Sequence, residues 1–511
     1  MAKQLDLFFG TAENPQGINA EVVAGLPEAA TCAMPKPETK GKTAAPTVMT
    51  MEAVASQWNL SEAFKKVASN KGAPGPDRQT IVDVREHIGE LIPELHVALL
   101  TGAYEPGEIR RVWLPKSGGG QRGLGIPNVV DRVVQQAVLQ ALSPQFEPTF
   151  HASSHGFRPG RSCQTAIAQA KEYMAQGYEY VVDLDLEKFF DKVNHQRLLA
   201  RLSQRVTDVR VLQLIQAMLK AKVVMPDGVV VSNDEGTPQG GPLSPLLSNI
   251  VLDELDRELD QRGHKFVRYA DDCNIYVRTE RAGQRVKASV TAFIEKRLRL
   301  KVNELKSAVA KPADRHFVGF RLRREPMTGE VEVLLSDRSL DRIRAKVRAL
   351  TPRNWGQSLD GCIQQANVYL HGWIGFFRIC SAAVQVPTLR NLDAHLRRRL
   401  RAVQLKQWRK RSSIARHLIR LGANTTTAWK QIYEGHQSLW SLSHEHVVDR
   451  ILNVEWFQQK GLKSLVAEWR RHNPEPVTVP GQQSLFAETS FGVKPFLSNG
   501  KPPPSKPKSR M

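Results

Sequence analysis

The feature that most restricts the possible folds of this chain is a pair of adjacent aspartates, Asp271 and Asp272, set between two apolar runs. Phe266 and Val267 precede the pair and residues 275–277 follow it, without the cluster of glycine, proline or serine that marks an ordinary solvated loop. This pattern predicts two short strands joined by a tight turn, with both carboxylates at the bend.

Neighbouring carboxylates repel each other, and the repulsion grows where the surroundings have a low dielectric constant. A cation relieves it, and Mg²⁺ binds through a few carboxylate oxygens together with substrate phosphates. The alternative is that Asp-Asp only marks a turn, as most such pairs do. The rest of the chain has to decide between a metal site and a simple turn.

The charge of the chain points to a polyanionic partner. Its 511 residues carry 72 Lys and Arg against 51 Asp and Glu, a formal net charge of +21. A charge of this size favours nucleic acid over a membrane surface, with incidental basicity as the weaker alternative. No run approaches 18 apolar residues and no secretion signal is evident, so a membrane span is not expected. The five cysteines form no C-x-x-C pair, which fits a reducing cytoplasm and argues against a zinc knuckle.

The regular part of the chain is expected between about residues 51 and 473, and the tails on either side lack periodicity. Helices are predicted at 55–68, 82–100, 131–142, 208–222, 246–262 and about 281–300. From about residue 336 the chain is predicted to be all-helical.

A glycine-rich hairpin with cationic side chains near its tip is predicted at residues 110–127. Lys116 and Arg122 lie on either side of its turn and could donate hydrogen bonds to a triphosphate. The alternative is a surface hairpin whose charges are simply solvated.

Residues 180–186 alternate strictly between apolar and other positions, which predicts a strand with two different faces. Val182 and Leu184 lie on one face, and Asp183 and Asp185 lie on the other. A carboxylate on a core strand is costly unless it is solvated or paired. Asp185 is therefore a second acidic feature that could serve a cation.

Two further segments are basic. The loop at 154–162 could hold a phosphate backbone, and the stretch 397–411 carries eight Lys and Arg and no acid on an amphipathic helix. Basic amphipathic helices also lie on membranes, but the acidic features favour nucleic acid. The residues expected to bind RNA or DNA are Arg158, Arg161, Arg397, Arg398, Arg401, Lys406, Arg409 and Lys410.

Together these features suit nucleotidyl transfer. That reaction needs an activated 3′-hydroxyl and neutralised triphosphate charge, which two Mg²⁺ ions about 3.5–4 Å apart can provide. Carboxylates from separate strands must converge, with cations nearby for the phosphates. Asp185, Asp271 and Asp272 fit the first need, and Lys116 and Arg122 fit the second.

The order of the motifs resembles that of group II intron reverse transcriptases over about residues 55–470. Residues 269–272, Tyr-Ala-Asp-Asp, are similar to the YxDD box of reverse transcriptases. The other blocks that match in order are 72–77, 114–116, 122–127, 156–162, 185–191, 237–245, the maturase (thumb) signature 370–377 and its basic continuation 397–411.

The resemblance implies an α+β fold of the right-hand polymerase type. Residues 51–325 would form fingers and a palm with an antiparallel sheet, and residues 326–435 an all-helical thumb or maturase domain. Residues 436–473 would form a small helical region that binds nucleic acid. The segments 1–50 and 474–511 would be disordered tails.

The resemblance also implies the roles of single residues at the site. Asp185, Asp271 and Asp272 would be the catalytic acids, and Asp185, Leu186 and Asp271 would hold two Mg²⁺ ions.

Four more residues would contact the incoming nucleotide. Lys116 and Arg122 would bind its triphosphate, and Gln239 would lie against the nucleotide and the template. Phe189 would lie under the sugar, where a bulky ring excludes a 2′-hydroxyl and so favours dNTPs.

The implied function is an RNA-directed DNA polymerase that also binds its group II intron RNA and a target DNA to promote splicing and mobility. Such a protein would work in the bacterial cytoplasm in association with the nucleoid. A splicing-only maturase and an intron-independent reverse transcriptase used in defence or repair are the alternatives. The intact acidic set argues against the first, and the maturase-like helices weigh against the second.

Two features of the chain ends depart from the core pattern. No cysteine follows Cys380, so the H-N-H nuclease domain of many family members is not expected. Residues 4–8, Gln-Leu-Asp-Leu-Phe, resemble the peptide by which bacterial proteins bind the replication sliding clamp, and residues 482–486 are a looser copy. Chance is the alternative for both. The expected anchors are Gln4, Leu7, Phe8, Leu485 and Phe486.

Overall fold

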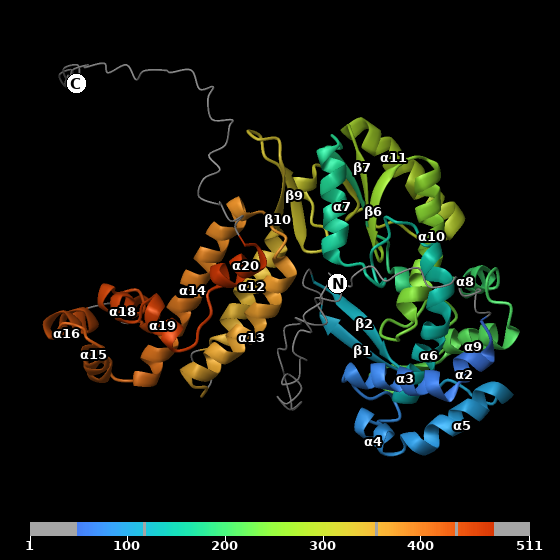
Figure 1. The fold of residues 1–511 in the computed structure, drawn as a ribbon, viewed down its shortest axis with the longest axis horizontal. Helices are drawn as coiled ribbons and strands as arrows, with labels where there is room; N and C mark the ends of the chain where they lie inside the picture. The colour runs from blue at the N-terminus through green and yellow to red at the C-terminus, as the bar shows by residue number, and fades with distance from the viewer. Residues whose placement is uncertain (1–48, 116–118, 353–355, 435–437, 475–511) are drawn as a thin grey trace, which may run out of the picture.

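The computed structural model describes residues 49–115, 119–352, 356–434 and 438–474. Figure 1 shows two lobes, one that contains two four-stranded sheets with their helices and one built from the C-terminal helices. The helices of the first lobe are α2 (Met51–Ala55), α3 (Gln57–Ser69), α4 (Ile81–Glu86), α5 (Ile88–Thr101), α6 (Val129–Phe146), α7 (Cys163–Ala175), α8 (His195–Leu202), α9 (Val209–Lys220), α10 (Ser244–Gln261) and α11 (Glu280–Phe293).

The central sheet has the strand order β6-β7-β3-β8, and each neighbouring pair is antiparallel. Its strands are β3 (Tyr180–Leu184), β6 (Lys265–Tyr269), β7 (Asp272–Val277) and β8 (Ala308–Ala310). Both faces are buried, because alternate residues of each strand enter two different apolar cores. Val182 and Leu184 pack on the face that belongs to the core of α10 and α11, and Val181 packs on the other with α7 (Figure 1). The antiparallel sheet and the two-faced strand at 180–186 are confirmed.

The second sheet has the order β2-β1-β4-β5. Its strands are β1 (Ile109–Pro115), β2 (Gln121–Ile126), β4 (Val223–Val224) and β5 (Val230–Val231). The hairpin predicted at 110–127 is the β1–β2 pair, with Pro115 opposite Gln121 at its tip. This hairpin lies on the side of the first lobe that faces the C-terminal helices in Figure 1.

The all-helical region begins with α12, as predicted from about residue 336. Its helices are α12 (Asp337–Leu350), α13 (Leu359–Phe377), α14 (Ala382–Trp408), α15 (Arg411–Arg420), α16 (Thr425–Glu434), α17 (Leu439–Leu442), α18 (His446–Ile451), α19 (Val454–Gln459) and α20 (Leu465–His472). A hairpin of β9 (Phe320–Arg324) and β10 (Val331–Leu335) precedes it. Within the described segments, no helix combines the length and the apolar character that crossing a membrane requires.

Two N-terminal helices that the periodicity predicted to be continuous are divided in the structure. The predicted helix 55–68 is divided at Ser56, whose side chain accepts a hydrogen bond from the Asn59 N–H and starts α3. The predicted helix 82–100 is divided at His87 into α4 and α5. Thr80 and Asp83 form a capping box that fixes the start of α4.

Candidate active site

The two adjacent aspartates lie at a two-residue turn between β6 and β7. Tyr269 pairs with Asp272 across the hairpin, which leaves Ala270 and Asp271 as the turn itself. Ala270 has a φ of +56°, a left-handed conformation that costs an L-residue about 1–2 kcal/mol. Backbone strain of this kind clusters at functional sites, where the surrounding structure has to hold it in place.

Asp185 directly follows β3, which is the other neighbour of β7 in the sheet. Leu184 pairs with Cys273 and the two strands are antiparallel, so continuing this register sets Asp185, after Leu184, across from Asp272, before Cys273. The Asp185 N–H donates to Ser307 Oγ at 3.0 Å, and its carbonyl accepts from the Asn303 N–H at 2.8 Å. The backbone on both sides of this carboxylate is therefore fixed.

A cation already stands beside one of the carboxylates. Lys306 Nζ lies 3.6 Å from Asp185 Oδ2, and the lysine side chain is 63% exposed. The position beside Asp185 therefore accommodates a positive charge. Among the described residues no group of three or more His, Cys, Asp and Glu side chains is arranged to hold a metal. Because Mg²⁺ usually takes one or two carboxylates and completes its shell with waters and substrate phosphates, the aspartates fit this ion.

Asp183, the other acid on the same face of β3, has a structural partner. Arg315 donates from both Nε and Nη2 to Asp183 Oδ2, at 2.8 and 2.6 Å. Burial raises the pKa of Asp183, and the Arg315 guanidinium opposes that rise. Arg315 Nη2 also donates to the carbonyl of Lys306, so it joins β3 to the segment that carries the lysine.

The predicted nucleotide-binding residues Arg122 and Gln239 are in direct contact. Arg122 Nε donates to Gln239 Oε1 at 2.7 Å, and the Gln239 carbonyl accepts from the Gly125 N–H at 2.8 Å. Gly240 has a φ of +139°, and a Cβ there would lie 2.3 Å from the Gly125 carbonyl oxygen. Only glycine allows the loop to approach β2 this closely. Lys116 lies outside the described residues.

Phe189, the residue expected to lie under the sugar of the nucleotide, is buried. Phe189 is 2% exposed, and its ring packs edge-on against the ring of Phe190 with the centroids 5.3 Å apart. A ring buried in the core offers almost no surface to a sugar. Contact between Phe189 and a nucleotide would therefore need its surroundings to move, and its predicted role stays a prediction.

Arg158, expected to contact phosphate, has acceptors inside the protein, and its predicted role stays a prediction. Its Nε pairs with Glu147, and its Nη1 donates to the carbonyls of His151 and Ser154 at 2.8 and 2.9 Å. The side chain is only 8% exposed. Buried charges need such partners, and these contacts stabilise the loop. Arg161, nearby, donates to the Ala152 carbonyl at 2.9 Å.

Two arginines of the basic helix α14 also contact other parts of the protein. Arg401 is buried, pairs with Asp449 and donates to the Leu452 carbonyl at 2.9 Å. A contact with nucleic acid would compete with these partners, and the predicted role of Arg401 stays a prediction. Arg398 lies over the Trp440 ring, with its Cζ 4.1 Å from the centroid.

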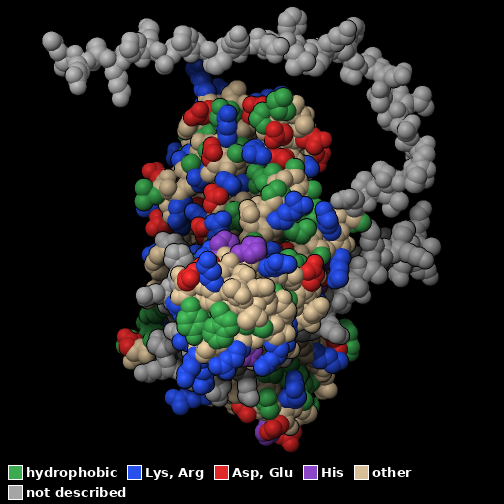
Figure 2. Space-filling model, turned by 90° about the vertical axis from the view of Figure 1, so that its left-hand side faces the viewer, with side chains coloured by type: hydrophobic (Ala, Val, Ile, Leu, Met, Phe, Trp, Pro, Cys, Tyr) green, Lys and Arg blue, Asp and Glu red, His purple; other side chains and the backbone are tan. Residues whose placement is uncertain are grey.

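The remaining predicted RNA or DNA contacts lie closer to solvent. Lys406, Arg409 and Lys410 are exposed and Arg397 is partly exposed. Figure 2 shows Lys and Arg side chains over much of the face that the C-terminal lobe turns toward the viewer. Phosphate contacts on this lobe therefore have to come from its surface cations.

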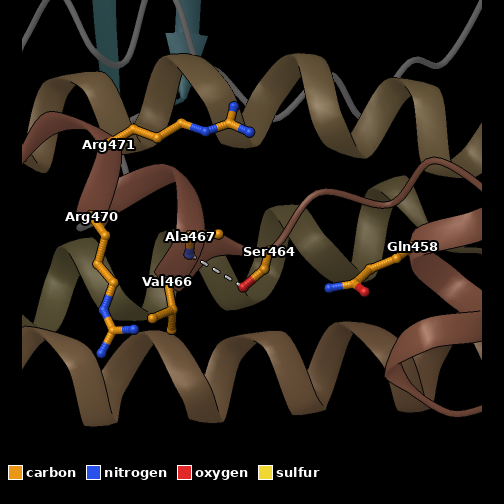
Figure 3. A pocket seen from close by; sticks show the side chains of 6 residues that line it. All are labelled: Gln458, Ser464, Val466, Ala467, Arg470 and Arg471. Carbon is orange, nitrogen blue, oxygen red and sulfur yellow. Dashed lines mark hydrogen bonds between the residues drawn. The ribbon is translucent and has the colours of Figure 1, made fainter.

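A hollow of about 540 Å³ lies in the C-terminal lobe, between α19 and α20. Figure 3 shows Arg470 and Arg471 pointing to opposite sides of it, while Ser464 caps α20 through the Ala467 N–H. Arg471 is already paired with Glu468 at 2.7 Å. The hollow lacks the paired carboxylates of the β6–β7 turn and is not a second candidate for the chemistry.

The imidazole of His316 gives a prediction for the pH dependence of stability. Burial, together with Arg338, Arg342 and Arg315, lowers the pKa of His316 to about 4 from 6.5. As the pH falls, the unfolded chain binds this proton at a higher pH than the folded chain does. The contribution of neutral His316 to the free energy of unfolding is therefore fully present above about pH 6.5 and falls as the pH drops toward 4. In thermal melts from pH 7.5 to 4.5, the wild type should lose stability more steeply than His316→Gln. Parallel curves would contradict this assignment.

Sequence reasoning missed the roles of two arginines: Arg268 donates to the carbonyl of Ala270, and Arg315 pairs with the carboxylate of Asp183. A signal for Arg268 was present, because it stands inside the apolar strand Lys265–Tyr269, where a charged side chain has to be paired. Its partners could not be read in the same way, since they lie on other elements.

Comparisons with known proteins agree with this geometry. Residues 114–322 match the family model for reverse transcriptase (RNA-dependent DNA polymerase), and residues 340–421 match that for the group II intron maturase-specific domain. Protein YkfC of Escherichia coli (strain K12) is 33% identical over 347 residues, which cover 60% of this chain and 90% of YkfC.

Two longer relatives match over smaller parts of their length. Group II intron-encoded protein LtrA of Lactococcus lactis subsp. cremoris is 36% identical over 208 residues, covering 40% of this chain and 34% of LtrA. The putative COX1/OXI3 intron 2 protein of Saccharomyces cerevisiae is 33% identical over 203 residues, covering 39% of this chain and 23% of that protein. These matches confirm the resemblance drawn from the motifs. The chain belongs to the group II intron-encoded reverse transcriptases and maturases, and it is an RNA-directed DNA polymerase.

Proposed function

We propose that this polymerase transfers nucleotides with two Mg²⁺ ions held by Asp185, Leu186 and Asp271. The observation that carries the proposal is the strand register, which sets the position after Leu184 across from Asp272 at the β6–β7 turn. When bound there, the two ions would activate the attacking 3′-hydroxyl and stabilise the charge on the leaving oxygens.

The protein groups around this point have separate tasks. Asp185, directly after β3, and Asp271, in the β6–β7 turn, present carboxylate oxygens from two separate segments, and Asp272 adds negative charge beside them. Lys306 neutralises Asp185 at 3.6 Å before substrate arrives, and from there it can give a proton to the leaving pyrophosphate. Arg122 donates to the triphosphate, with Lys116 of the same hairpin as its companion.

Arg122→Ala is expected to raise the KM for dNTP by roughly 10- to 100-fold, because hydrogen bonds to charged groups contribute about 1.5–3 kcal/mol. The Arg122 contact with Gln239 shows that the guanidinium can reach the loop that would lie against the nucleotide. Steady-state primer extension at varied dNTP measures the effect. Arg323→Ala, on the separate β9–β10 hairpin, is the control and should leave KM unchanged. Equal KM values for both variants would remove Arg122 from the nucleotide site.

We also propose that the C-terminal lobe binds the intron RNA to promote splicing, and that reverse transcription at a DNA target provides mobility. The maturase-specific match over residues 340–421 supports this, as do the exposed cations Lys406, Arg409 and Lys410. Contacts should be mainly to phosphates and 2′-hydroxyls, since A-form RNA hides its major groove from side chains. The proposed sliding-clamp anchors, Gln4, Leu7, Phe8, Leu485 and Phe486, lie outside the described residues and stay a prediction.

Primer extension on poly(rA)/oligo(dT) tests the central claim. The purified wild-type chain should extend the primer with dTTP and Mg²⁺, and chelation of the metal should stop it. A maturase that only splices would bind intron RNA but extend nothing. Absence of extension under conditions where the protein binds the template–primer would overturn the proposed chemistry.

A further inference from the structure

The guanidinium of Arg268 connects the catalytic turn to the interior of the protein. Arg268 is 0% exposed and is one of the largest fully buried side chains. Its Nη1 donates to the carbonyl oxygen of Ala270 at 2.9 Å, and Ala270 is the residue directly before Asp271. Its Nε and Nη2 donate to the two carboxylate oxygens of Asp256 at 2.7 and 2.6 Å. One planar group therefore joins the turn to helix α10.

All five N–H groups of Arg268 have an acceptor. Besides Asp256 and Ala270, Nη1 donates to Asn249 Oδ1 at 3.0 Å and Nη2 donates to Ser154 Oγ at 2.7 Å. The five donors of a guanidinium point in fixed directions within one plane. Once the acceptors on other elements hold that plane, the position of the Ala270 carbonyl is fixed as well.

The loop at residues 153–156 supports the same arrangement. The Arg268 N–H donates to the Ser153 carbonyl, and the Arg268 carbonyl accepts from the His155 N–H, both at 2.9 Å. Asn249 Nδ2 donates to the Gly156 carbonyl at 2.9 Å. Asn249 thus contacts both the loop and the guanidinium, and the turn is held from two sides.

The spacing of Asn249 and Asp256 along α10 explains how both side chains reach Arg268. Asn249 and Asp256 are seven residues apart, a spacing that puts both side chains on one face of a helix. Helix α10 begins just after the loop that carries Gln239, and Ser244 Oγ donates to the Pro238 carbonyl at 2.8 Å. The nucleotide loop and the catalytic turn are therefore anchored to the same helix.

We propose that Arg268 is a positioning residue for polymerisation. By donating to the Ala270 carbonyl it holds the left-handed turn in the one conformation that aims Asp271 at the metal site, with Asp256 and Asn249 as its supports. Arg268 contacts neither substrate nor metal. The proposal rests on the proposed function, because it takes Asp271 to be a metal ligand.

The test measures metal binding itself, by titrating the full chain with Mn²⁺ and following the free ion by electron paramagnetic resonance. Arg268→Lys keeps the positive charge but loses the planar fork, and Asp256→Asn removes the carboxylate that orients it. Both variants should weaken Mn²⁺ binding by about 10- to 100-fold, as is usual when groups behind metal ligands are removed. Raising the metal concentration should restore part of their primer extension.

The matched control is Asp253→Asn, which lies three residues before Asp256 on the same helix. Asp253 pairs with Arg257 at 2.7 Å, and Arg257 is 52% exposed, so this ion pair is not the one that holds the turn. Its Mn²⁺ binding should equal that of the wild type. Asn249→Ala removes one acceptor of the guanidinium, and it decides the matter should Arg268→Lys fail to fold; a smaller loss of Mn²⁺ affinity is then expected.

Folded variants that melt at lower temperature but bind Mn²⁺ as the wild type does would overturn the proposal, since Arg268 would then act on stability alone. Asp271→Asn, titrated alongside, separates this failure from another. If Asp271→Asn also leaves Mn²⁺ binding unchanged, the metal site of the proposed function is wrong, and the positioning role falls with it.

Discussion

Asp271→Asn is expected to lower the rate of primer extension by about a thousandfold or more while the protein stays folded. The amide has nearly the size of the carboxylate but lacks the charge that holds a cation. Metal ions contribute several kcal/mol to the stabilisation of a transition state, and each 1.4 kcal/mol changes the rate tenfold. The measurement is single-turnover extension on poly(rA)/oligo(dT) with Mg²⁺.

The stability of this variant should not fall, because removing one of several neighbouring carboxylates relieves their repulsion. A thermal melt checks that expectation. Asp227→Asn serves as the control, since Asp227 is an exposed carboxylate in the turn between β4 and β5. It should extend the primer as the wild type does. Activity of Asp271→Asn within tenfold of this control would show that the turn carboxylate is not catalytic.

The secondary structure around the site was predictable because its signals are local. The apolar runs on both sides of Asp271 indicate the β6–β7 hairpin, and the alternation at 180–186 indicates β3. Both depend only on side-chain periodicity within a few residues. The hairpin β9–β10 was missed although four of the five residues of Val331–Leu335 are apolar. Its connection contains Pro326 and Gly329 but not the Asn-Gly or Asp-Gly pair that marks a hairpin most clearly.

The roles of individual cations were harder to predict, because they depend on partners far along the chain. Arg158 and Arg401 are basic residues in basic segments, yet Glu147 and Asp449 neutralise them inside the fold. Composition identifies a basic stretch but not which of its residues face solvent. Periodicity adds little here, since long side chains can reach partners on several sides.

For Arg268, the sequence indicates that the side chain is paired but not which groups it contacts. A lone arginine in an apolar strand could have been recognised as paired. The sequence does not reveal that one of its five N–H groups donates to the carbonyl of Ala270, the residue before Asp271. That contact requires β6, α10 and the loop at 153–156 to be assembled first. The acidic residues of the candidate site could therefore be identified from the sequence, whereas the contact of Arg268 with the turn could not.

Gly156→Ala is expected to damage both stability and activity, because the added methyl group has no space. Its Cβ would lie 2.3 Å from the Ala270 nitrogen and 3.0 Å from Ala270 Cα, and these are backbone atoms that cannot rotate away. Overpacking of this kind costs about 1–3 kcal/mol of folding free energy. A displacement of about 1 Å at catalytic groups also lowers the rate roughly a hundredfold. Thermal melts and single-turnover extension measure the two effects.

The control for this substitution is Gly89→Ala on α5, where a Cβ would meet nothing within 4 Å. Alanine is favoured over glycine in a helix by about 1 kcal/mol, so Gly89→Ala should be neutral or slightly stabilising and fully active. The loss of stability and the loss of activity in Gly156→Ala should also respond differently to conditions that favour folding. Extra salt or osmolyte can restore folding, but the rate should stay low because the loop still displaces the turn. Full activity of refolded Gly156→Ala would mean that the turn keeps its geometry without this close backbone contact.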